Sequence, residues 1–258
     1  MKIKYLKKAA AYLVLSVLLL CVSAVSNAVI MTLDTTIRDF SASHDDFQSA
    51  KGGNGFFTGL VTNTLGPNGK PVYVGGQTLS SKENFDQWFN DRPGINISLE
   101  NSLVATESTI NPGVFTFSSN AYFPINGIGF GNEGYRHNYH FTTEIHTQFT
   151  YTGFGLGSDF TFKGDDDVWV YVNGELVIDL GGIHPKRTGS VDIDSLGLTE
   201  GSTYSLDIFH AERQTVGSNF SFTTAAKLTS TTVPEPSAFL MMVLGLALLG
   251  CLRRKQAI

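Results

Sequence analysis

The stretch that decides the fold is GDDDVWVYVNGELVIDLGG, residues Gly164 to Gly182. Two apolar runs flank Asn173-Gly174. An Asn-Gly pair between such runs is typical of a two-residue type I′ β-hairpin, because both residues tolerate the positive φ angles of that turn. In a strand, successive side chains point to opposite faces. The three valines of VWVYV should therefore share one face, and Trp169 and Tyr171 the other.

Three consecutive carboxylates, Asp165, Asp166 and Asp167, precede the first run. Two carboxylates about 4 Å apart near a protein surface repel by roughly 4 kcal/mol. Either the side chains splay into solvent and cap a turn, as Asp often does, or a cation lies among them. Calcium takes about six to eight oxygen ligands, which adjacent aspartates can supply. The residues alone leave both interpretations open, and the EF-hand pattern is absent.

The surrounding chain is rich in Gly, Ser, Thr, Asn and Phe and shows no long helical periodicity. Short alternating runs recur about every 8 to 12 residues, which predicts an all-β fold, an antiparallel β-sandwich or barrel. The candidate strands are Val114–Phe117, Tyr139–Tyr151, Asp159–Phe162, Val168–Val172, Glu175–Asp179, Ser190–Asp194, Thr203–His210 and Ser218–Lys227.

One short helix is predicted in the N-terminal half, over Ser81–Asn90. Ser80 or Ser81 can cap its first turn, and Arg92-Pro93-Gly94 ends it. Phe85, Trp88 and Phe89 form an apolar stripe at helical spacing, which indicates core packing and not a cofactor site.

Both ends of the chain carry targeting features. Residues 1–28 combine four lysines, an apolar run and Ser26-Asn27-Ala28, which is typical of a secretory signal peptide cleaved after Ala28. Residues 229–258 hold a short polar linker, 15 apolar residues at Ala238–Leu252 and then three basic residues. The plain interpretation of that end is a transmembrane segment with its basic side in the cytoplasm.

A more specific interpretation comes from Val233-Pro234-Glu235-Pro236-Ser237, followed by the apolar run and Arg253-Arg254. Together these three parts resemble the PEP-CTERM sorting signal of Gram-negative bacteria. The resemblance implies processing by exosortase, transient anchoring in the inner membrane through this tail, and a final location on the outer surface or in the extracellular matrix.

Without both ends, residues 29–234 hold 11 basic and 22 acidic side chains, a net charge of −11. Such an acidic surface argues against binding nucleic acid, and against binding membranes except through the tail. It suits cations and neutral glycans. Cys21 and Cys251 both lie outside this part, so the mature domain has no disulfide.

Several polar residues could bind ligands. His140, Glu144 and His146 would share one face of a strand and could bind zinc, although a plain polar face is the favoured interpretation. His184 and the segment His210-Ala211-Glu212-Arg213 either contact a ligand or hold loops in place by hydrogen bonds.

Enzyme templates are missing: the sequence has no Gly-x-Ser-x-Gly, HExxH or phosphate-loop motif. We therefore predict that the protein is not an enzyme. A glycan-cleaving enzyme with a pair of catalytic carboxylates is the weakest functional interpretation of the sequence.

Six segments together resemble the fibro-slime domain, known from secreted inducing factors of slime moulds and from surface proteins of cellulose-adhering bacteria. They are Thr36–Phe47, Gly69–Tyr73, Phe85–Asp91, Asn138–Tyr151, Phe160–His184 and Leu206–Phe220. The resemblance runs from about Thr36 to Thr224, so residues 29–228 are expected to form one such domain.

Fibro-slime domains are in turn similar to the protective-antigen-type β-sandwich. In its lectin members, two consecutive aspartates joined by a cis peptide hold a calcium ion that binds sugar hydroxyls. Here the resemblance places that role on Asp165 and Asp166, or one residue later on Asp166 and Asp167. It suggests Asn219 as a further ligand, and His184 at the rim.

The sequence thus favours a secreted, calcium-dependent carbohydrate-binding or adhesion module whose partner is a polysaccharide or surface glycan. The alternative is a structural matrix protein that binds other surface proteins without metal or glycan.

Overall fold

The computed structural model describes residues 29–75, 79–153, 155, 159–215 and 217–228. Almost all of its regular structure is antiparallel β, which confirms the predicted fold class. The signal peptide, the sorting tail and its apolar segment lie outside these residues. Within them, no helix is long and apolar enough to cross a membrane.

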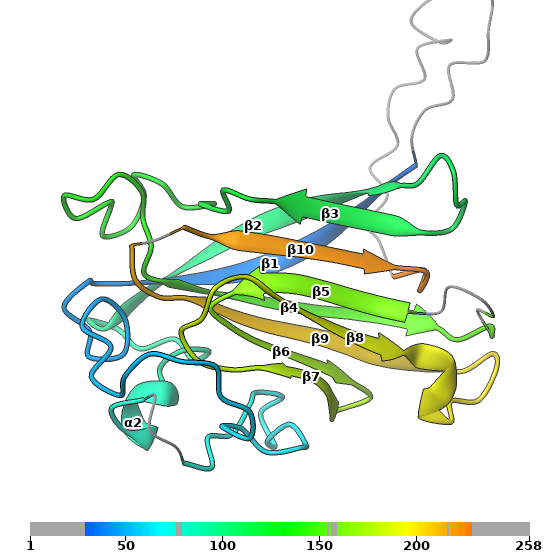
Figure 1. Cartoon of the computed structure of the whole chain (residues 1–258), viewed down its shortest axis with the longest axis horizontal. Coiled ribbons are helices and arrows are strands. Elements are labelled where there is room, and N and C mark those ends of the chain that lie inside the picture. The colour runs from blue at the N-terminus through cyan, green and yellow to red at the C-terminus, as the bar shows by residue number, and fades with distance from the viewer. Residues whose placement is uncertain (1–28, 76–78, 154, 156–158, 216, 229–258) are drawn as a thin grey trace, which may run out of the picture.

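Ten strands form one continuous hydrogen-bonded sheet in the order β7-β6-β9-β4-β1-β2-β3-β10-β5-β8. The sheet folds over itself, so that β3, β10, β5 and β8 lie across β1, β4, β9 and β6 (Figure 1). The strands are β1 Ile30–Phe40, β2 Asn96–Glu107, β3 Phe115–Ser119, β4 Phe141–Thr150, β5 Asp159–Asp165, β6 Asp167–Val172, β7 Glu175–Leu180, β8 Arg187–Asp192, β9 Thr203–Glu212 and β10 Asn219–Thr224.

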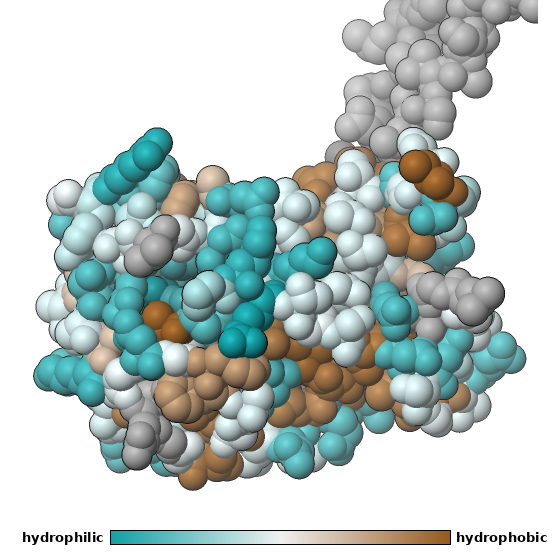
Figure 2. Space-filling model, in the orientation of Figure 1, coloured by the Kyte–Doolittle hydropathy of each residue, from teal (hydrophilic) through white to brown (hydrophobic). Residues whose placement is uncertain are grey.

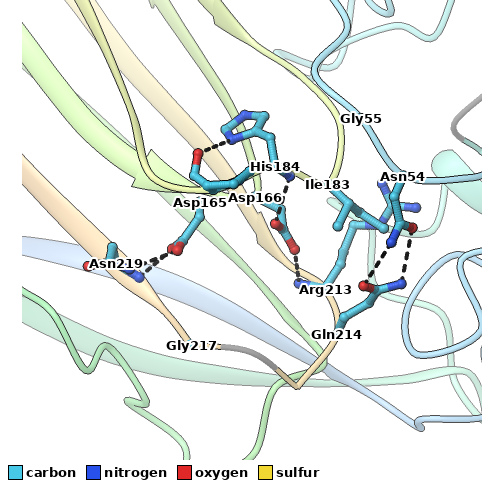
Figure 3. A pocket seen from close by; sticks show the side chains of 11 residues that line it. Asn54, Gly55, Asp165, Asp166, Ile183, His184, Arg213, Gln214, Gly217 and Asn219 are labelled. Atoms are coloured by element: carbon cyan, nitrogen blue, oxygen red, sulfur yellow. Dashed lines mark hydrogen bonds between the residues drawn. The ribbon is translucent and has the colours of Figure 1, made fainter.

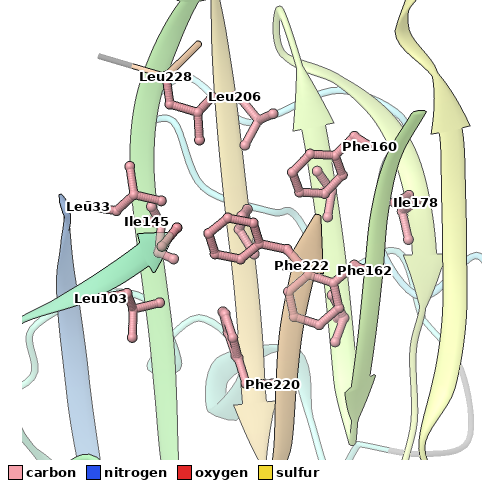
Figure 4. Close-up of a cluster of buried hydrophobic side chains, with 14 of the residues drawn as sticks. Leu33, Leu103, Ile145, Phe160, Phe162, Ile178, Leu206, Phe220, Phe222 and Leu228 are labelled. Carbon is pink, nitrogen blue, oxygen red and sulfur yellow. The ribbon is translucent and has the colours of Figure 1, made fainter. Parts of the chain in front are cut away.

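The main core lies between the two layers. It is built from the inward-facing residues of each strand, such as Phe160 and Phe162 of β5 and Phe220 and Phe222 of β10 (Figure 4). The valines of β6 point into this core. Burial of such side chains is the main stabilising contribution in a chain of this size.

The β6–β7 hairpin has the predicted geometry. Asn173 and Gly174 have φ angles of 52° and 77°, and Val172 pairs with Glu175 across the turn. Trp169 and Tyr171 point away from the main core, as the alternation predicted.

A second, aromatic core covers the outer face of β6 and β9. Residues 41–95, the connection between β1 and β2, supply one side of it, and Trp169, Tyr171, Phe209 and Ala211 supply the other. Figure 1 shows this connection, with the short helix α2, packed against the β6–β9 side of the sandwich.

Helix α2 spans only Lys82–Phe85, so the predicted end at Asn90 was wrong. Ser81 caps it as expected, accepting a hydrogen bond from the Asn84 amide at 3.1 Å. The following amides, Gln87 and Trp88, bond to carbonyls three residues back, which makes tight turns and not α-helix. These turns place Trp88 in the aromatic core, where it is fully buried, which confirms its structural role.

Candidate functional site

The three aspartates lie where the chain passes from one layer of the sandwich to the other. Asp165 ends β5 and lies opposite Asn219 of β10. Asp167 begins β6 and lies opposite Ala211 of β9. Asp166 lies between the two strands, and the Asp165–Asp166 peptide bond is cis. Residues from both layers of the sandwich therefore surround the Asp165–Asp166 dipeptide.

The Asp165 carboxylate is bound by Asn219. It accepts hydrogen bonds from the Asn219 backbone amide and from Asn219 Nδ2, the latter at 2.7 Å. Its carbonyl oxygen accepts a bond from His210 Nε2 at 2.8 Å. The structure thus brings Asn219 next to the aspartate pair.

Asp166 is nearly buried, with 6% of its surface exposed. Its two oxygens accept the backbone amides of His184 and Arg213, each at 3.1 Å. Burial, and after it the charge of Asp167, raises the pKa of Asp166 well above its usual range. The side chain is therefore a costly place for an uncompensated negative charge.

Asp167 is fully buried and faces a different set of partners. One oxygen accepts the Gly182 amide, and the other lies 3.1 Å from Arg213 Nη1. Arg213 Nε donates to the Asp46 carbonyl at 2.6 Å, and the guanidinium lies over the Trp88 ring. Asp167 thus belongs to a buried ion pair, and we leave it out of any proposed ligand set.

The Asp165–Asp166 pair borders a hollow of about 460 Å³ (Figure 3). Figure 3 shows the two carboxylates turned apart, Asp165 towards Asn219 and Asp166 towards Arg213. Besides this pair, the lining comes from the β1–β2 connection, the β7–β8 connection, and the β9–β10 connection together with the first residue of β10, Asn219. The lining residues are Asn54, Gly55, Asp165, Asp166, Ile183, His184, Pro185, Arg213, Gln214, Gly217 and Asn219.

His210 and Glu212 lie below this surface and do not line the hollow. His210 is fully buried, and burial lowers its pKa to about 4, so its ring is neutral at pH 7. Glu212 is 1% exposed, and burial, then the charges of Asp166 and Asp165, raise its pKa well above the usual range. Besides the aspartate pair and Asn219, four residues were expected to contact a ligand: His184, His210, Glu212 and Arg213. Of these four, only His184 and Arg213 line the hollow.

The local charge is unbalanced. The carboxyl groups of Asp165, Asp166, Asp167 and Glu212 form one cluster, in which Asp167 is the one paired with Arg213. Glu212 Oε2 is buried without a hydrogen-bond partner among the described residues. A divalent cation beside Asp165 and Asp166 would offset this excess, and oxygen donors suit calcium. No group of three or more His, Cys, Asp or Glu side chains in the described part of the chain could hold a metal. A calcium ion here would therefore need Asn219, backbone oxygens or water as well.

The His140–Glu144–His146 face does not form a zinc site among the described residues. Glu144 is 2% exposed and forms ion pairs with Arg38, at 2.6 Å, and with Lys70. His146 bonds Glu144 and, at 2.6 Å, Asp207. His140 is buried and bonds Gln48 at 3.0 Å. The face is polar as expected but only partly solvated, because His140 and Glu144 are buried and only His146 is exposed.

Sequence reasoning missed Asn54 and Gln214 at the mouth of the hollow. Their side-chain amides bond each other reciprocally, at 3.1 and 3.2 Å. The two residues are 160 positions apart. No local pattern could reveal the pair, because an amide in a loop carries no periodic signal.

One glycine fixes the approach of the β1–β2 connection to this site. Gly182 has a φ of 93°, and a Cβ there would collide with the Gly55 carbonyl oxygen. We expect Gly182→Ala to lower the free energy of unfolding by about 2–4 kcal/mol, from the positive φ and the overlap together. Gly201→Ala is the matched control, because Gly201 has a φ of 80° but open space around it. If urea unfolding shows the same loss of unfolding free energy for Gly182→Ala and Gly201→Ala, the overlap with the Gly55 carbonyl oxygen contributes nothing to that loss.

Comparison with known families gives two matches. The sequence profile of the PA14 domain matches residues 125–238, which include the aspartate pair, the β6–β7 hairpin and Asn219. The chain carries a PA14 domain match. The PEP-CTERM protein-sorting motif matches residues 232–255.

Curated proteins similar to this chain include two from Dictyostelium discoideum. Protein psiQ is 42% identical over 213 residues, covering 76% of this chain and 21% of psiQ. Protein psiC is 38% identical over 237 residues, covering 84% of this chain and 44% of psiC. The chain thus spans less than half of either relative. A solved PA14 domain of an antifreeze protein, MpAFP, covers 83% of the chain at 8% identity, with a TM-score of 0.32, which is too low to bear on the fold.

Proposed function

We propose that this protein is exported to the cell surface or extracellular matrix, where its sandwich domain, residues 29–228, binds glycan hydroxyls through a calcium ion. Asp165 and Asp166 would hold the ion together with Asn219. The PA14 and PEP-CTERM matches support an exported surface protein. The observation that carries the binding site is the aspartate pair at the edge of the hollow, with Asn219 bonded to it. The proposed role is non-catalytic.

Three regions of the chain would then contribute to binding the cation and the sugar. The aspartate pair supplies charge for the cation. The β1–β2 connection, through Asn54 and Gly55, and the β9–β10 connection, through Gln214, shape the opening in which a sugar would lie. The tail would be recognised by exosortase and would pass through the inner membrane before processing. We also propose that the domain is of the fibro-slime type, on the segments that resemble it.

A second candidate is a structural matrix protein whose aspartates bind no metal. One observation favours it: backbone or side-chain N–H groups bond all four oxygens of Asp165 and Asp166. Aspartates bonded in this way can be a device that holds three loops together. The protein would then act by binding other surface proteins.

Thermal melting with millimolar calcium and with EDTA separates the two candidates. Calcium at about 100 times its dissociation constant should add about 2.7 kcal/mol, a rise in Tm of about 5–10 °C for a domain of this size. Asp166→Asn should abolish the calcium-dependent rise, because the amide brings no charge. Comparing each protein with and without calcium cancels any change in basal stability.

Asp34→Asn is the control, since Asp34 is exposed on β1, away from the site. It should keep the full calcium-dependent rise. If the wild-type protein melts at the same temperature in calcium and in EDTA, the calcium site is wrong and the structural candidate leads. If calcium does raise Tm, retention on immobilised glycans in calcium and in EDTA tests the sugar itself.

A further inference from the structure

The outer face of β3, β10, β5 and β8 carries hydroxyl side chains in ordered rows. The aromatic residues of these strands point into the core, so the alternate positions face outward. The strand register aligns those positions across the sheet. One row is Thr188, Lys163, Ser221 and Ser118, and the next is Ser190, Thr161, Thr223, Thr116 and Thr106.

Neighbouring hydroxyls in these rows touch. Thr116 lies 3.1 Å from Thr223, Ser118 lies 3.0 Å from Ser221, and Thr161 lies 2.9 Å from Ser190, oxygen to oxygen. A hydroxyl donates one hydrogen bond and accepts two. Each pair therefore keeps unused capacity towards solvent. Strands lie about 4.8 Å apart, and alternate residues along a strand about 6.7 Å apart, so the face presents a regular polar grid.

A hollow of about 260 Å³ lies over this grid, and its charge is unlike that of the rest of the domain. Lys163 of β5 and Lys186, just before β8, both line it, and none of its lining residues is acidic. Figure 2 shows the face from outside, pale in the middle as Ser and Thr are on its scale, with teal residues beside it.

Neither of these two lysines forms an ion pair in the described part of the chain, which is also true of Arg92, Arg136, Arg187 and Lys227. Lys186 bonds the Asn120 amide oxygen at 2.9 Å, and neither lysine has a carboxylate within ion-pair distance among the described residues. Elsewhere in the described chain, ion pairs with carboxylates are formed by Arg38, Lys51, Lys70, Lys82 and Arg213. Two unpaired lysines facing one hollow, in a domain of net charge −11, make a local positive site.

We propose that this face is a second binding surface, for an acidic polysaccharide. The uronate carboxylates of the polymer would pair with Lys163 and Lys186, and its hydroxyls would bond the Ser and Thr rows. The contact needs no metal and is separate from the aspartate site. A single-stranded nucleic acid fits less well, because bases stack on exposed aromatic rings, and Phe222, the aromatic residue of this lining, is 1% exposed.

Affinity electrophoresis of the full chain, in mild detergent with EDTA, tests the proposal. Alginate, a polyuronate, is cast in the gel, with uncharged dextran in a parallel gel. We expect alginate to retard the protein and dextran not to. Replacing both lysines, Lys163→Ala with Lys186→Ala, should weaken alginate binding about tenfold, as two lost ion contacts imply. Salt at 0.5 M should weaken wild-type binding as well.

Two matched variants separate this surface from general charge effects. Lys51→Ala with Lys82→Ala removes the same charge from exposed positions on the β1–β2 connection and should bind alginate as the wild type does. Ser221→Val with Thr223→Val leaves the charge unchanged and should weaken binding several-fold, because it removes hydroxyls from both rows.

The proposal is overturned if the variant lacking Lys163 and Lys186 binds alginate normally, or if both double-lysine variants lose binding equally. Equal retardation by dextran and alginate would also reject it. Asp166→Asn should bind alginate normally in EDTA, and loss of binding there would move the contact to the aspartate site. If calcium does not raise Tm, the proposed calcium site is wrong, but the outcome of this alginate test does not depend on it.

Discussion

Arg213→Met should lower the free energy of unfolding by about 3–5 kcal/mol, the usual cost of removing one partner from a buried ion pair. The side chains of Arg213 and Asp167 are both fully buried, so the substitution leaves the carboxylate without its charged partner. The same substitution also removes the hydrogen bond to the Asp46 carbonyl, which joins the β1–β2 connection to β9. Urea unfolding of the two proteins measures the difference.

The double variant Arg213→Met with Asp167→Asn should recover part of this loss, because it no longer buries an unpaired charge. Arg187→Met is the control, since Arg187 is exposed and its guanidinium lies over the Phe56 ring and not in a buried ion pair. A loss below about 1 kcal/mol for Arg213→Met would contradict this prediction and show that the buried pair contributes little to stability.

Acidification from pH 6.5 to pH 4 should destabilise the domain through two buried histidines. Burial lowers the pKa of both His140 and His210 to about 4, against 6.5 in an unfolded chain. Between these values the unfolded state binds more protons, so stability falls as pH falls. The shift corresponds to about 3 kcal/mol for each histidine. Well above pH 6.5 both rings are neutral in the folded and in the unfolded state, so neither histidine makes the stability depend on pH there.

Asp166 and Glu212 act in the opposite direction. Their folded pKa values are raised, so their contribution to stability is full at low pH and is lost as pH rises. The effect of a histidine on stability must therefore be measured as the difference between the wild type and a variant that lacks this histidine. The gap in unfolding free energy between wild type and His140→Gln should change by about 3 kcal/mol between pH 7 and pH 4. His137→Gln is the control, and a constant gap for His140→Gln would contradict the prediction.

Much of the sandwich was predictable because local rules and tertiary packing agree. The β6–β7 hairpin combines a turn sequence with strict alternation along β6, and both features are present in the structure, with one register shift in the pairing to β7. The eight predicted strands all occur, within a few residues of their expected bounds. The aromatic stripe of Phe85, Trp88 and Phe89 packs as core, because bulky apolar residues have no favourable alternative to burial.

The two strands that were missed show where local rules end. β1 does alternate, with Met31, Leu33, Thr35 and Ile37 buried, but it directly follows the stretch that was predicted to be a signal peptide. In β2 most residues are exposed and only three are buried, so its pattern resembles a polar loop. Its strand state comes from pairing with β1 along the whole length of that strand, a long-range contact that sequence periodicity does not encode.

The candidate site, like the fold, was predictable from the sequence only in part. The resemblance placed Asp165 and Asp166 together with Asn219, and the structure brings Asn219 against Asp165. It could not show that Asp167 turns away to Arg213, or that His210 and Glu212 lie under the surface. Alternation along β9 puts His210 and Glu212 on the same face, but whether that face meets the hollow depends on how the layers pack.

The strand order has a consequence for the time the chain needs to fold. β10 pairs with β3 and β1 with β4, each about a hundred residues away in sequence, and Arg213 bonds Asp46 across 167 positions. Chains dominated by such distant pairings fold in about milliseconds to seconds, far more slowly than helical bundles. A chain that must cross a membrane before it folds is helped by that delay, because it stays extended while it is threaded. The topology that makes the sandwich stable outside the cell would thus also keep it from forming too early inside.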